Sequence, residues 1–291
     1  MNILTFDIEE WFHLLEHPQV RDETSWGRLE TRLPQMLDRI LDLLDETGRK
    51  GCFFCLGWVA RTYPELVRRI DERGHELASH SDVHSLIFEQ TPAAFRQELV
   101  KSKRTLEDVS GKRIRAFRAP GFSLVERCSW AFDILIEEGF EIDCSVFPAS
   151  RAHGGMPAFP SARPVWVETS AGRIKEFPMS VARVLGRAMV FSGGGYFRVI
   201  PALILERLWA DSDYVMTYFH PRDFEPDQPM LPGLGPLRRF KSYYGLGRAA
   251  PKLKRLLQRH EFISLAQADS QVDWTGAETV RIDTLQPATA A

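Results

Sequence analysis

Two histidines separated by three residues are the first feature of the sequence that could do chemistry. His80 and His84 directly follow a short apolar run at 75–79. Residues four apart share one side of a helical turn, so both imidazoles could reach a single cation. A zinc-like ion also needs another ligand, often a carboxylate, and an open position for water. The H-x-x-x-H spacing alone is weak, because most such pairs are surface residues without a ligand.

A cluster of acids near the N-terminus can supply the missing carboxylate. Asp7, Glu9 and Glu10 fall within four residues at the end of an apolar strand, 3–7. Such close acids repel each other unless a cation or an arginine lies nearby. Two of them fit two roles, because one carboxylate can bind a metal while another takes a proton from water. An exposed acidic turn is the alternative interpretation, and it suits Glu10 best.

The elements around these residues alternate regularly. Predicted strands cover 3–7, 52–56, 75–79, 114–117 and 140–144, and helical patterns begin at Pro34, Pro64 and Thr91 and cover 125–138. This alternation is typical of parallel βαβ units, and hence of an α/β sheet or barrel. Asp7, His80, Arg118 and Asp143 lie at or just after strand ends, where both architectures place their sites.

The regular alternation of strands and helices ends after Phe147. Prolines and glycines make 147–195 loop-rich, with one hairpin predicted from 165–168 and 173–177. Further predictions are a helix at 201–210, a buried strand at 214–219 that ends at His220, a helix from Pro251 to Arg259, a strand at 262–265 and a flexible tail at 276–291.

Composition narrows the class of protein. The chain has 291 residues, which allows two ordinary domains or one barrel. Its formal net charge of −2 provides no basic field for nucleic acid. The basic residues Arg238, Arg239, Lys241, Arg248, Lys252, Lys254 and Arg255 are interpreted as a solvated face, with no nucleic-acid partner expected.

The cysteines and the search for targeting segments add little to the functional prediction. Cys52 and Cys55 form a C-x-x-C that could suggest redox activity or half a zinc site, but the surrounding string is apolar, which favours core cysteines. We find no signal-peptide pattern at the N-terminus and no apolar stretch long enough to span a membrane. A cytoplasmic location is therefore expected.

Several short motifs, taken in order, resemble the NodB-homology polysaccharide deacetylases, carbohydrate esterase family 4. They are Thr5-Phe6-Asp7, Trp58-Val59-Ala60, Gly74-His75-Glu76-Leu77-Ala78-Ser79-His80-Ser81 with His84, Arg118-Ala119-Pro120-Gly121-Phe122, and Tyr218-Phe219-His220. The strings Phe6–His13, His220-Pro221-Arg222 and 239–244 resemble the branch found near exosortase and exopolysaccharide loci. The resemblance covers about residues 2–265.

The resemblance implies a fold and roles for the matching residues. The fold is a distorted (β/α) barrel of seven or eight strands. Asp7 is implied as the general base, Arg118 as its partner, and His220 as the general acid that protonates the leaving amine. His80 and His84 are implied metal ligands, with Ser81 supporting them. The metal would be Zn²⁺, or else Co²⁺, Ni²⁺, Mn²⁺ or Fe²⁺.

Two departures from the family pattern bear on the site. The commonest first motif has adjacent aspartates, whereas this chain has Asp7-Ile8-Glu9-Glu10. A related branch of the family spaces its base and ligand by one residue, so the resemblance implies Glu9 as the carboxylate ligand, with Glu10 as the alternative. We find no Asp-Trp motif ahead of His220, and the segment 193–198 occupies that region. The orientation and pKa of His220 therefore depend on residues that the family pattern does not supply.

The predicted activity is hydrolysis of N-acetyl groups on an amino-sugar polysaccharide or its lipid-linked precursor, in exopolysaccharide or cell-envelope glycan synthesis. A backbone N–H near Ser145 or Val146 is expected to hold the oxyanion. Predicted sugar-contacting residues are Trp11, Phe12, Pro120, Phe122, Tyr196 and Phe197. The alternatives are an amidohydrolase acting on a small cyclic amide or ureide, and an inactive carbohydrate-binding protein.

The site also bears on domain organisation. Asp7 and His220 must meet, so we expect one catalytic domain over 1–265, with core motifs in 2–146 and 211–224. An insertion at 147–210 and an extension at 225–275 complete it.

Overall fold

The regular alternation predicted for the first half of the chain builds a parallel sheet. The computed structural model describes residues 1–14, 20, 23–150, 154–184 and 187–285. Its first strands are adjacent and parallel in chain order: β2 (Thr5–Ile8), β3 (Cys52–Cys55), β4 (Glu76–Ser79), β5 (Ala116–Phe117) and β6 (Ile142–Asp143). The sheet continues through β8 (Gly172–Glu176), β7 (Val165–Thr169) and β12 (Thr279–Arg281).

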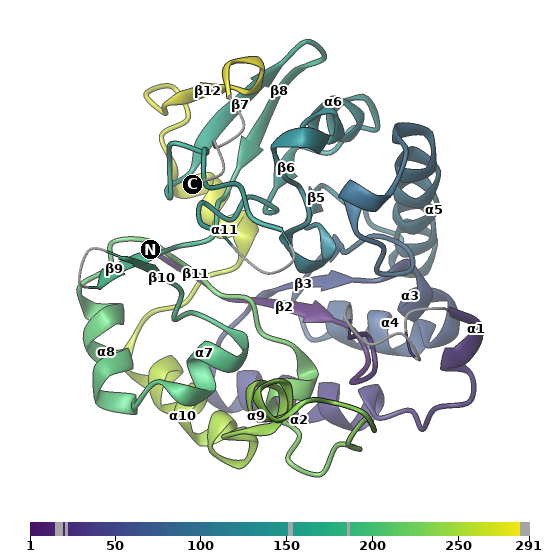
Figure 1. Cartoon of the computed structure of the whole chain (residues 1–291), viewed down its shortest axis with the longest axis vertical. Coiled ribbons are helices and arrows are strands. Elements are labelled where there is room, and N and C mark those ends of the chain that lie inside the picture. The colour runs from purple at the N-terminus through teal and green to yellow at the C-terminus, as the bar shows by residue number, and fades with distance from the viewer. Residues whose placement is uncertain (15–19, 21–22, 151–153, 185–186, 286–291) are drawn as a thin grey trace.

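Helices connect these strands and cover one face of the sheet (Figure 1). They are α2 (Leu33–Thr47), α3 (Gly57–Thr62), α4 (Pro64–Glu72), α5 (Pro92–Ser110) and α6 (Trp130–Glu137). Proline stands in the first turn of α2, α4 and α5, where no intrahelical N–H is needed. The Thr91 hydroxyl accepts a hydrogen bond from Ala94 N and caps α5. The predicted helix starts are thus confirmed.

The N-terminus joins the sheet to the last core strand. β1 (Asn2–Ile3) pairs in parallel with β11 (Val215–Met216), and single bridges join Phe6 to Phe219 and Gly193 to Tyr218. Within the described residues no ladder links this side directly to β8, so the hydrogen bonding does not close a full circle. The architecture is a mixed α/β fold with a parallel sheet, consistent with a distorted NodB-type barrel.

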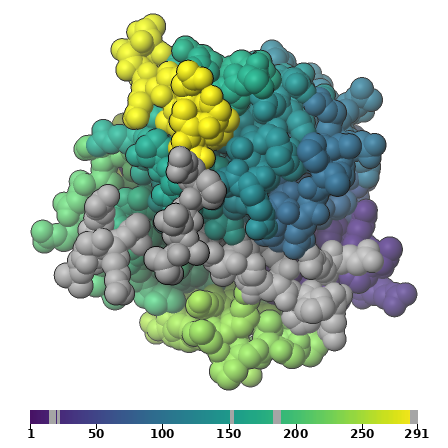
Figure 2. Space-filling view, turned by 45° about the horizontal axis from the view of Figure 1, so that its top comes forward, coloured from purple at the N-terminus to yellow at the C-terminus, as the bar shows by residue number. Residues whose placement is uncertain are grey.

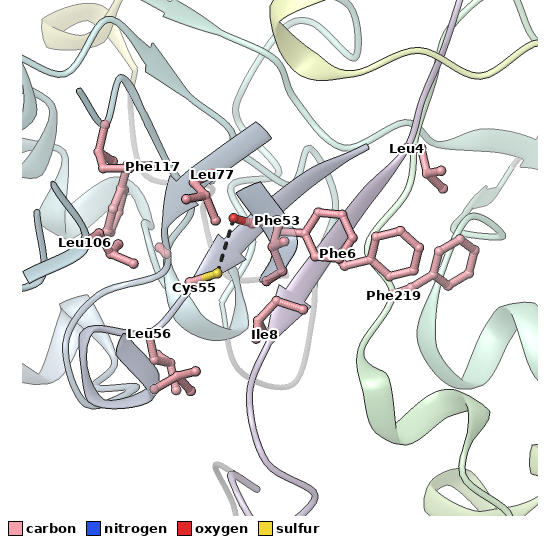
Figure 3. Packing of buried hydrophobic residues seen from close by; sticks show 14 of the residues in the cluster. Leu4, Phe6, Ile8, Phe53, Cys55, Leu56, Leu77, Leu106, Phe117 and Phe219 are labelled. Carbon is pink, nitrogen blue, oxygen red and sulfur yellow. Dashed lines mark hydrogen bonds between the residues drawn. The ribbon is translucent and has the colours of Figure 1, made fainter. Parts of the chain in front are cut away.

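Strand side chains alternate between two apolar layers. Phe6, Ile8, Phe53 and Cys55 belong to the core beneath the helices, where Phe6 lies between Phe53 and Phe219 (Figure 3). The opposite side of β3 presents Cys52 and Phe54 to a second core that includes residues of β6 and β11. This alternation leaves Thr5 and Asp7 of β2 on the side away from the helices.

The second half is less regular. It contains β9 (Ala182–Val184), β10 (Arg187–Met189), α7 (Gly194–Val199), α8 (Ala202–Ala210), α9 (Pro236–Tyr243), α10 (Leu246–Arg259) and α11 (Leu265–Gln271). Short elements complete the chain: α1 (Glu23–Trp26) and the 3₁₀ turns η2 (Ile87–Glu89), η3 (Pro120–Phe122), η4 (Glu126–Cys128), η5 (Pro221–Phe224) and η6 (Ile282–Thr284). The predicted hairpin is confirmed as antiparallel β7 and β8.

Three predicted elements differ from the structure. α10 begins at Leu246 rather than Pro251, so the proline lies inside the helix. Because proline has no N–H, one backbone carbonyl in the first turn lacks its intrahelical donor, and this carbonyl lies near the solvent-exposed start of the helix. Residues 262–265 form a single bridge, Ile3 to Ile263, and then enter α11. The expected tail includes β12, which pairs with β7, while 286–291 lie outside the described residues.

All four cysteines are buried and free, as expected for core residues. Cys55 Sγ points into the apolar layer and donates to Phe53 O at 3.6 Å (Figure 3). Among the described residues, no helix is both long and apolar enough to cross a lipid bilayer.

Candidate active site

The end of β2 carries two buried carboxylates that point to the same side. Asp7 and Glu9 are separated by Ile8, so the pleat of the strand sends both to the same side. Asp7 N donates to Phe219 O at 2.7 Å, which fixes the strand end against the segment that leads to His220. Both carboxylates are nearly inaccessible to solvent.

Glu10 points elsewhere. Its carboxylate accepts hydrogen bonds from the backbone N–H groups of Arg32 and Leu33 and from the hydroxyl of Thr31. It therefore satisfies free donors at the start of α2, as acids commonly do at helix N-termini. The structure brings Glu9, not Glu10, to the histidines.

The two histidines lie in a loop after β4, not on the helical turn that the spacing predicts. Ser81 and His84 both have left-handed backbone conformations, with φ of 71° and 62°. The Ser81 hydroxyl accepts a hydrogen bond from His84 N at 3.2 Å and closes the turn. Positive φ values at non-glycine residues cost free energy and are often found at functional sites.

Neighbouring helices hold this loop from behind. Asp82 pairs with Arg61 of α3 and with Lys101 of α5, the latter at 2.7 Å. A Cβ on Gly57 would lie 2.3 Å from Asp82 Oδ1, so only glycine permits this approach. Glu98 accepts hydrogen bonds from two backbone N–H groups of the loop. The helices on the outside of the sheet thus fix the loop geometry.

Glu9, His80 and His84 form a group that could hold a metal ion. One ligand atom from each lies within 4.8 Å of the others. His80 Nδ1 lies 2.8 Å from Arg118 O, so it carries the proton and leaves Nε2 as the free lone pair. Burial lowers the pKa of His80 to about 4, so its ring is neutral near neutral pH, as ligation requires.

The carboxylate of Glu9 is also suited to binding a cation. Glu9 Oε2 is buried and lies 2.6 Å from His84 Nε2, yet it has no partner with hydrogen-bond geometry among the described residues. Burial alone would raise the pKa of Glu9, but His84 and His220 together lower it below its ordinary value. A buried carboxylate that stays ionised beside two imidazoles is a donor set suited to Zn²⁺ or a related ion.

Arg118 links β5 to the end of β2. Its side chain is fully buried, and one guanidinium nitrogen donates to both Asp7 Oδ1 and Thr5 Oγ1 at 2.8 Å. The guanidinium also lies 4.1 Å from the ring centre of Phe54. Arg118 therefore lies in contact with Asp7, its implied partner.

His220 completes the group from the second half of the chain. Its Nε2 lies 3.8 Å from Asp7 Oδ2 and 3.7 Å from Glu9 Oε1, and its side chain is 23% exposed. Burial alone would lower the pKa of His220, but Glu9, Asp223 and Asp7 raise it to about 9. The imidazole is therefore protonated at neutral pH and can donate a proton.

Two residues that the sequence analysis did not identify hold His220 in place. Asp223 Oδ2 lies 3.2 Å from His220 Nδ1 and accepts from His220 N at 3.0 Å. Arg198 Nε lies 3.2 Å from Asp223 Oδ1. The three-residue spacing of His220 and Asp223 around Pro221 resembles a capping turn and was an available signal; the Arg198 contact depends on tertiary structure.

The predicted sugar-contacting aromatics are mostly core residues. Trp11 and Phe12 are buried, and Trp11 Nε1 donates to Glu30 O. Phe122 packs edge-on against Tyr218, and Phe197 packs against Phe219. The other two predicted residues are Pro120, buried in η3, and Tyr196, which is 53% exposed on α7. Of these six residues, only Tyr196 exposes a large part of its side chain to solvent.

The expected oxyanion donors are already engaged. Ser145 N donates to Asp143 Oδ2, and Val146 N donates to Glu176 Oε1, each at 3.1 Å. Their assignment to an oxyanion is therefore wrong for this conformation. The two carboxyls are fully buried at paired positions of β6 and β8, and burial raises the pKa of each.

Comparison with known proteins agrees with this arrangement. Residues 4–131 match the family model "Polysaccharide deacetylase". The N-terminal part of the chain, somewhat less than half of it, is therefore similar to the polysaccharide deacetylases. Residues 144–269 match a second model, "Domain of unknown function (DUF3473)", which includes His220 and Asp223.

Curated relatives are similar to the N-terminal part of this chain. The peptidoglycan-N-acetylglucosamine deacetylase of Bacillus cereus is 30% identical over 94 residues, 32% of this chain and 34% of that protein. The chitooligosaccharide deacetylase of Bradyrhizobium sp. is 30% identical over 82 residues, 28% and 37% of the two chains. The matched part of the chain thus spans about a third of these relatives.

A solved structure matches over much more of the fold. A Mycobacterium smegmatis protein assigned to the polysaccharide deacetylases has a TM-score of 0.63 at 21% identity, with 99% of this chain and 92% of that chain covered. At this identity the likeness concerns the fold.

Proposed function

We propose that this protein is a metal-dependent hydrolase that removes N-acetyl groups from an amino-sugar glycan. The observation that carries the proposal is the convergence of Glu9, His80 and His84 beside a carboxylate and a protonated imidazole. The match of residues 4–131 to the polysaccharide deacetylase model supports the reaction type, and two relatives are named as deacetylases of peptidoglycan N-acetylglucosamine and of chitooligosaccharide.

Glu9, His80 and His84 would hold the metal. A bound zinc-like ion lowers the pKa of its water and polarises the amide carbonyl. Because the three protein ligands leave other positions open, the set resembles catalytic rather than structural sites.

Asp7 acts as the general base in this proposal. It accepts a proton from the water that attacks the acetyl carbon, while Arg118 holds the carboxylate by its 2.8 Å contact. A general base contributes about 10²–10⁴-fold to rate in typical enzymes.

His220 acts as the general acid. It donates the Nε2 proton to the sugar nitrogen as the C–N bond breaks, giving acetate and a free amine. Asp223 fixes the ring through Nδ1, so that Nε2 faces Asp7 and Glu9. It thereby takes the place of the Asp-Trp motif that the sequence lacks. In the cell, the expected substrate is an exopolysaccharide, a cell-envelope glycan or a lipid-linked precursor of either.

Acetate release from a panel of N-acetylated oligosaccharides tests the proposal. The panel contains chitooligosaccharides, peptidoglycan fragments and poly-N-acetylglucosamine, each with added Zn²⁺, Co²⁺ or Mn²⁺. We expect release from at least one glycan and its loss after chelation. Metal binding without turnover on any glycan, with turnover on a cyclic ureide, would contradict the proposed substrate class.

A further inference from the structure

The region around α9 carries an unusual surface. Eight large apolar side chains are exposed among the described residues, and all of them fall between residues 196 and 244. They are Tyr196, Val199, Leu203, Ile204, Met230, Leu237, Phe240 and Tyr244. Clustered exposed apolar side chains mark binding surfaces, whereas scattered single ones do not.

α9 itself buries none of its residues. Leu237 is 68% exposed and Phe240 47%, and the Phe240 ring lies 4.6 Å from that of Tyr244. A groove of about 470 Å³ follows the helix, lined by Leu234, Pro236, Arg239, Phe240, Tyr243 and Tyr244. A helix of eight residues is marginal in water, so burial of this face must come from a partner or from tertiary support.

Positive charge surrounds this apolar face. From residue 228 to 260 the chain has no Asp or Glu, but it has Arg238, Arg239, Lys241, Arg248, Lys252, Lys254, Arg255 and Arg259. Lys254, Arg255 and Arg259 pair with glutamates on α2 and α8. Arg239, Lys241 and Arg248 are exposed, and the described residues offer them no ion pair.

We infer that this face, defined as Leu237, Phe240 and Tyr244 with Arg239, Lys241 and Arg248, binds the surface of an anionic lipid bilayer. Aromatic and aliphatic side chains beside Lys and Arg form the pattern of helices that lie in the membrane interface. A second copy of the chain is a less suitable partner, because pairing this face with itself would bring two positively charged surfaces together. Single-stranded nucleic acid is held mainly by aromatic stacking and basic residues, and the aliphatic Leu237, Met230 and Ile204 do not fit that role.

The surface is connected to the candidate active site. Arg198 of α7 donates to the carbonyl oxygens of Lys241, Ser242 and Tyr244 at the end of α9. The same guanidinium contacts Asp223, which contacts His220. Two side chains therefore separate α9 from His220, and Figure 1 shows α7 and α9 on the same side of the sheet. In Figure 2 the light-green segment that carries α9 forms one edge of the molecule. Lipid contact at α9 would hold the site close to a membrane surface.

Vesicle flotation of the full chain tests this inference. The vesicles contain phosphatidylcholine alone or phosphatidylcholine with phosphatidylglycerol, at low and high salt. We expect binding to the anionic vesicles only, reversed by salt. Asp7→Asn protein should bind equally well, because lipid binding does not need turnover. Failure of the proposed hydrolysis thus leaves this result unaffected.

Matched variants assign the binding to α9. Arg239→Gln with Lys241→Gln should weaken binding about fivefold for each charge removed. Leu237→Ser with Phe240→Ser should weaken it on the order of tenfold by loss of apolar burial. Arg68→Gln with Arg104→Gln removes two exposed charges on α4 and α5 and should change binding little.

Three results would overturn the inference. They are absence of binding to anionic vesicles, equal losses in the α4 and α5 control, and a dimer in the absence of lipid that Leu237→Ser with Phe240→Ser dissolves. Light scattering without vesicles measures the last of these.

Discussion

The two halves of the chain contribute to the candidate site by different structural means. Residues 4–131 deliver Asp7, Glu9, His80 and Arg118 from the ends of adjacent parallel strands, whose order follows the sequence. The region after residue 144 delivers His220 from a turn beyond β11, held by contacts with Arg198 and Asp223. A parallel ladder positions several residues at once, whereas the second half positions one side chain through specific polar contacts.

The largest effect is expected at the proposed metal ligands of the first half. His80→Ala removes one of the three ligands, so bound zinc and acetate release should both fall to background. Elemental analysis of the purified protein measures the metal. His260→Ala, outside the site, is the control, and full metal retention in His80→Ala would contradict the ligand assignment.

Substitution of Asp7, the proposed general base in the same half, should slow the chemical step without changing metal binding. Asp7→Asn keeps the shape and the contact with Arg118 but cannot take a proton. We expect acetate release to fall on the order of 10³-fold with metal content unchanged. Asp42→Asn on the exposed face of α2 is the control. Near-normal turnover in Asp7→Asn would mean that another group is the base.

A substitution in the second half should lower the rate less and should change its dependence on pH. Asp223→Asn removes a negative charge beside His220, so the pKa of that imidazole falls from about 9. Since the acid must be protonated, the alkaline limb of the kcat/KM profile should move to lower pH. The rate at its optimum should fall roughly ten- to a hundredfold.

A purely structural role for Asp223 would lower stability and leave the alkaline limb in place. Measurement of the unfolding midpoint alongside the pH profile separates these two outcomes.

The smallest effect is expected where the halves meet, at the buried pair of Asp143 on β6 and Glu176 on β8. Burial raises the pKa of Glu176 well above its unfolded value. The stability that this group contributes is therefore complete at low pH and is lost as pH rises through the folded pKa. Glu176→Gln mimics the protonated form and should keep its thermal midpoint in alkaline buffer, where the wild type loses stability. Glu168→Gln on the exposed part of β7 should follow the wild type.

The sequence was most informative where local pattern and position agree. Alternating strands and helices with Pro and Gly at their ends predicted β2 to β6 and the helices between them, and strand-end polar residues located Asp7, His80 and Arg118. The prediction of Glu9 rather than Glu10 came from the spacing in a related branch of the family. The pleat of the strand accounts for this spacing, because it sends residues 7 and 9 to the same side.

Other features depend on tertiary contacts that no local pattern encodes. The loop of His80 and His84 adopts left-handed turns that two helices hold in place. Arg61 of α3 and Lys101 of α5 pair with Asp82 of the loop, and Glu98 of α5 accepts hydrogen bonds from the loop backbone. Trp11 resembles a sugar-stacking residue in sequence but is buried and packs edge-on against Phe12. The contact of Arg198 with Asp223 joins residues that no motif relates.

The pairing of β1 with β11 constrains how the protein is made. Asn2 and Ile3 pair with Val215 and Met216, and Ile3 also forms a bridge with Ile263, so the first strand leaves the ribosome long before its neighbours are synthesised. Until then β1 and β2 present an open strand edge that can pair with other chains. Non-local pairing of this kind slows folding. The nascent chain therefore passes through a vulnerable stage that ends only when the segment carrying His220 has emerged.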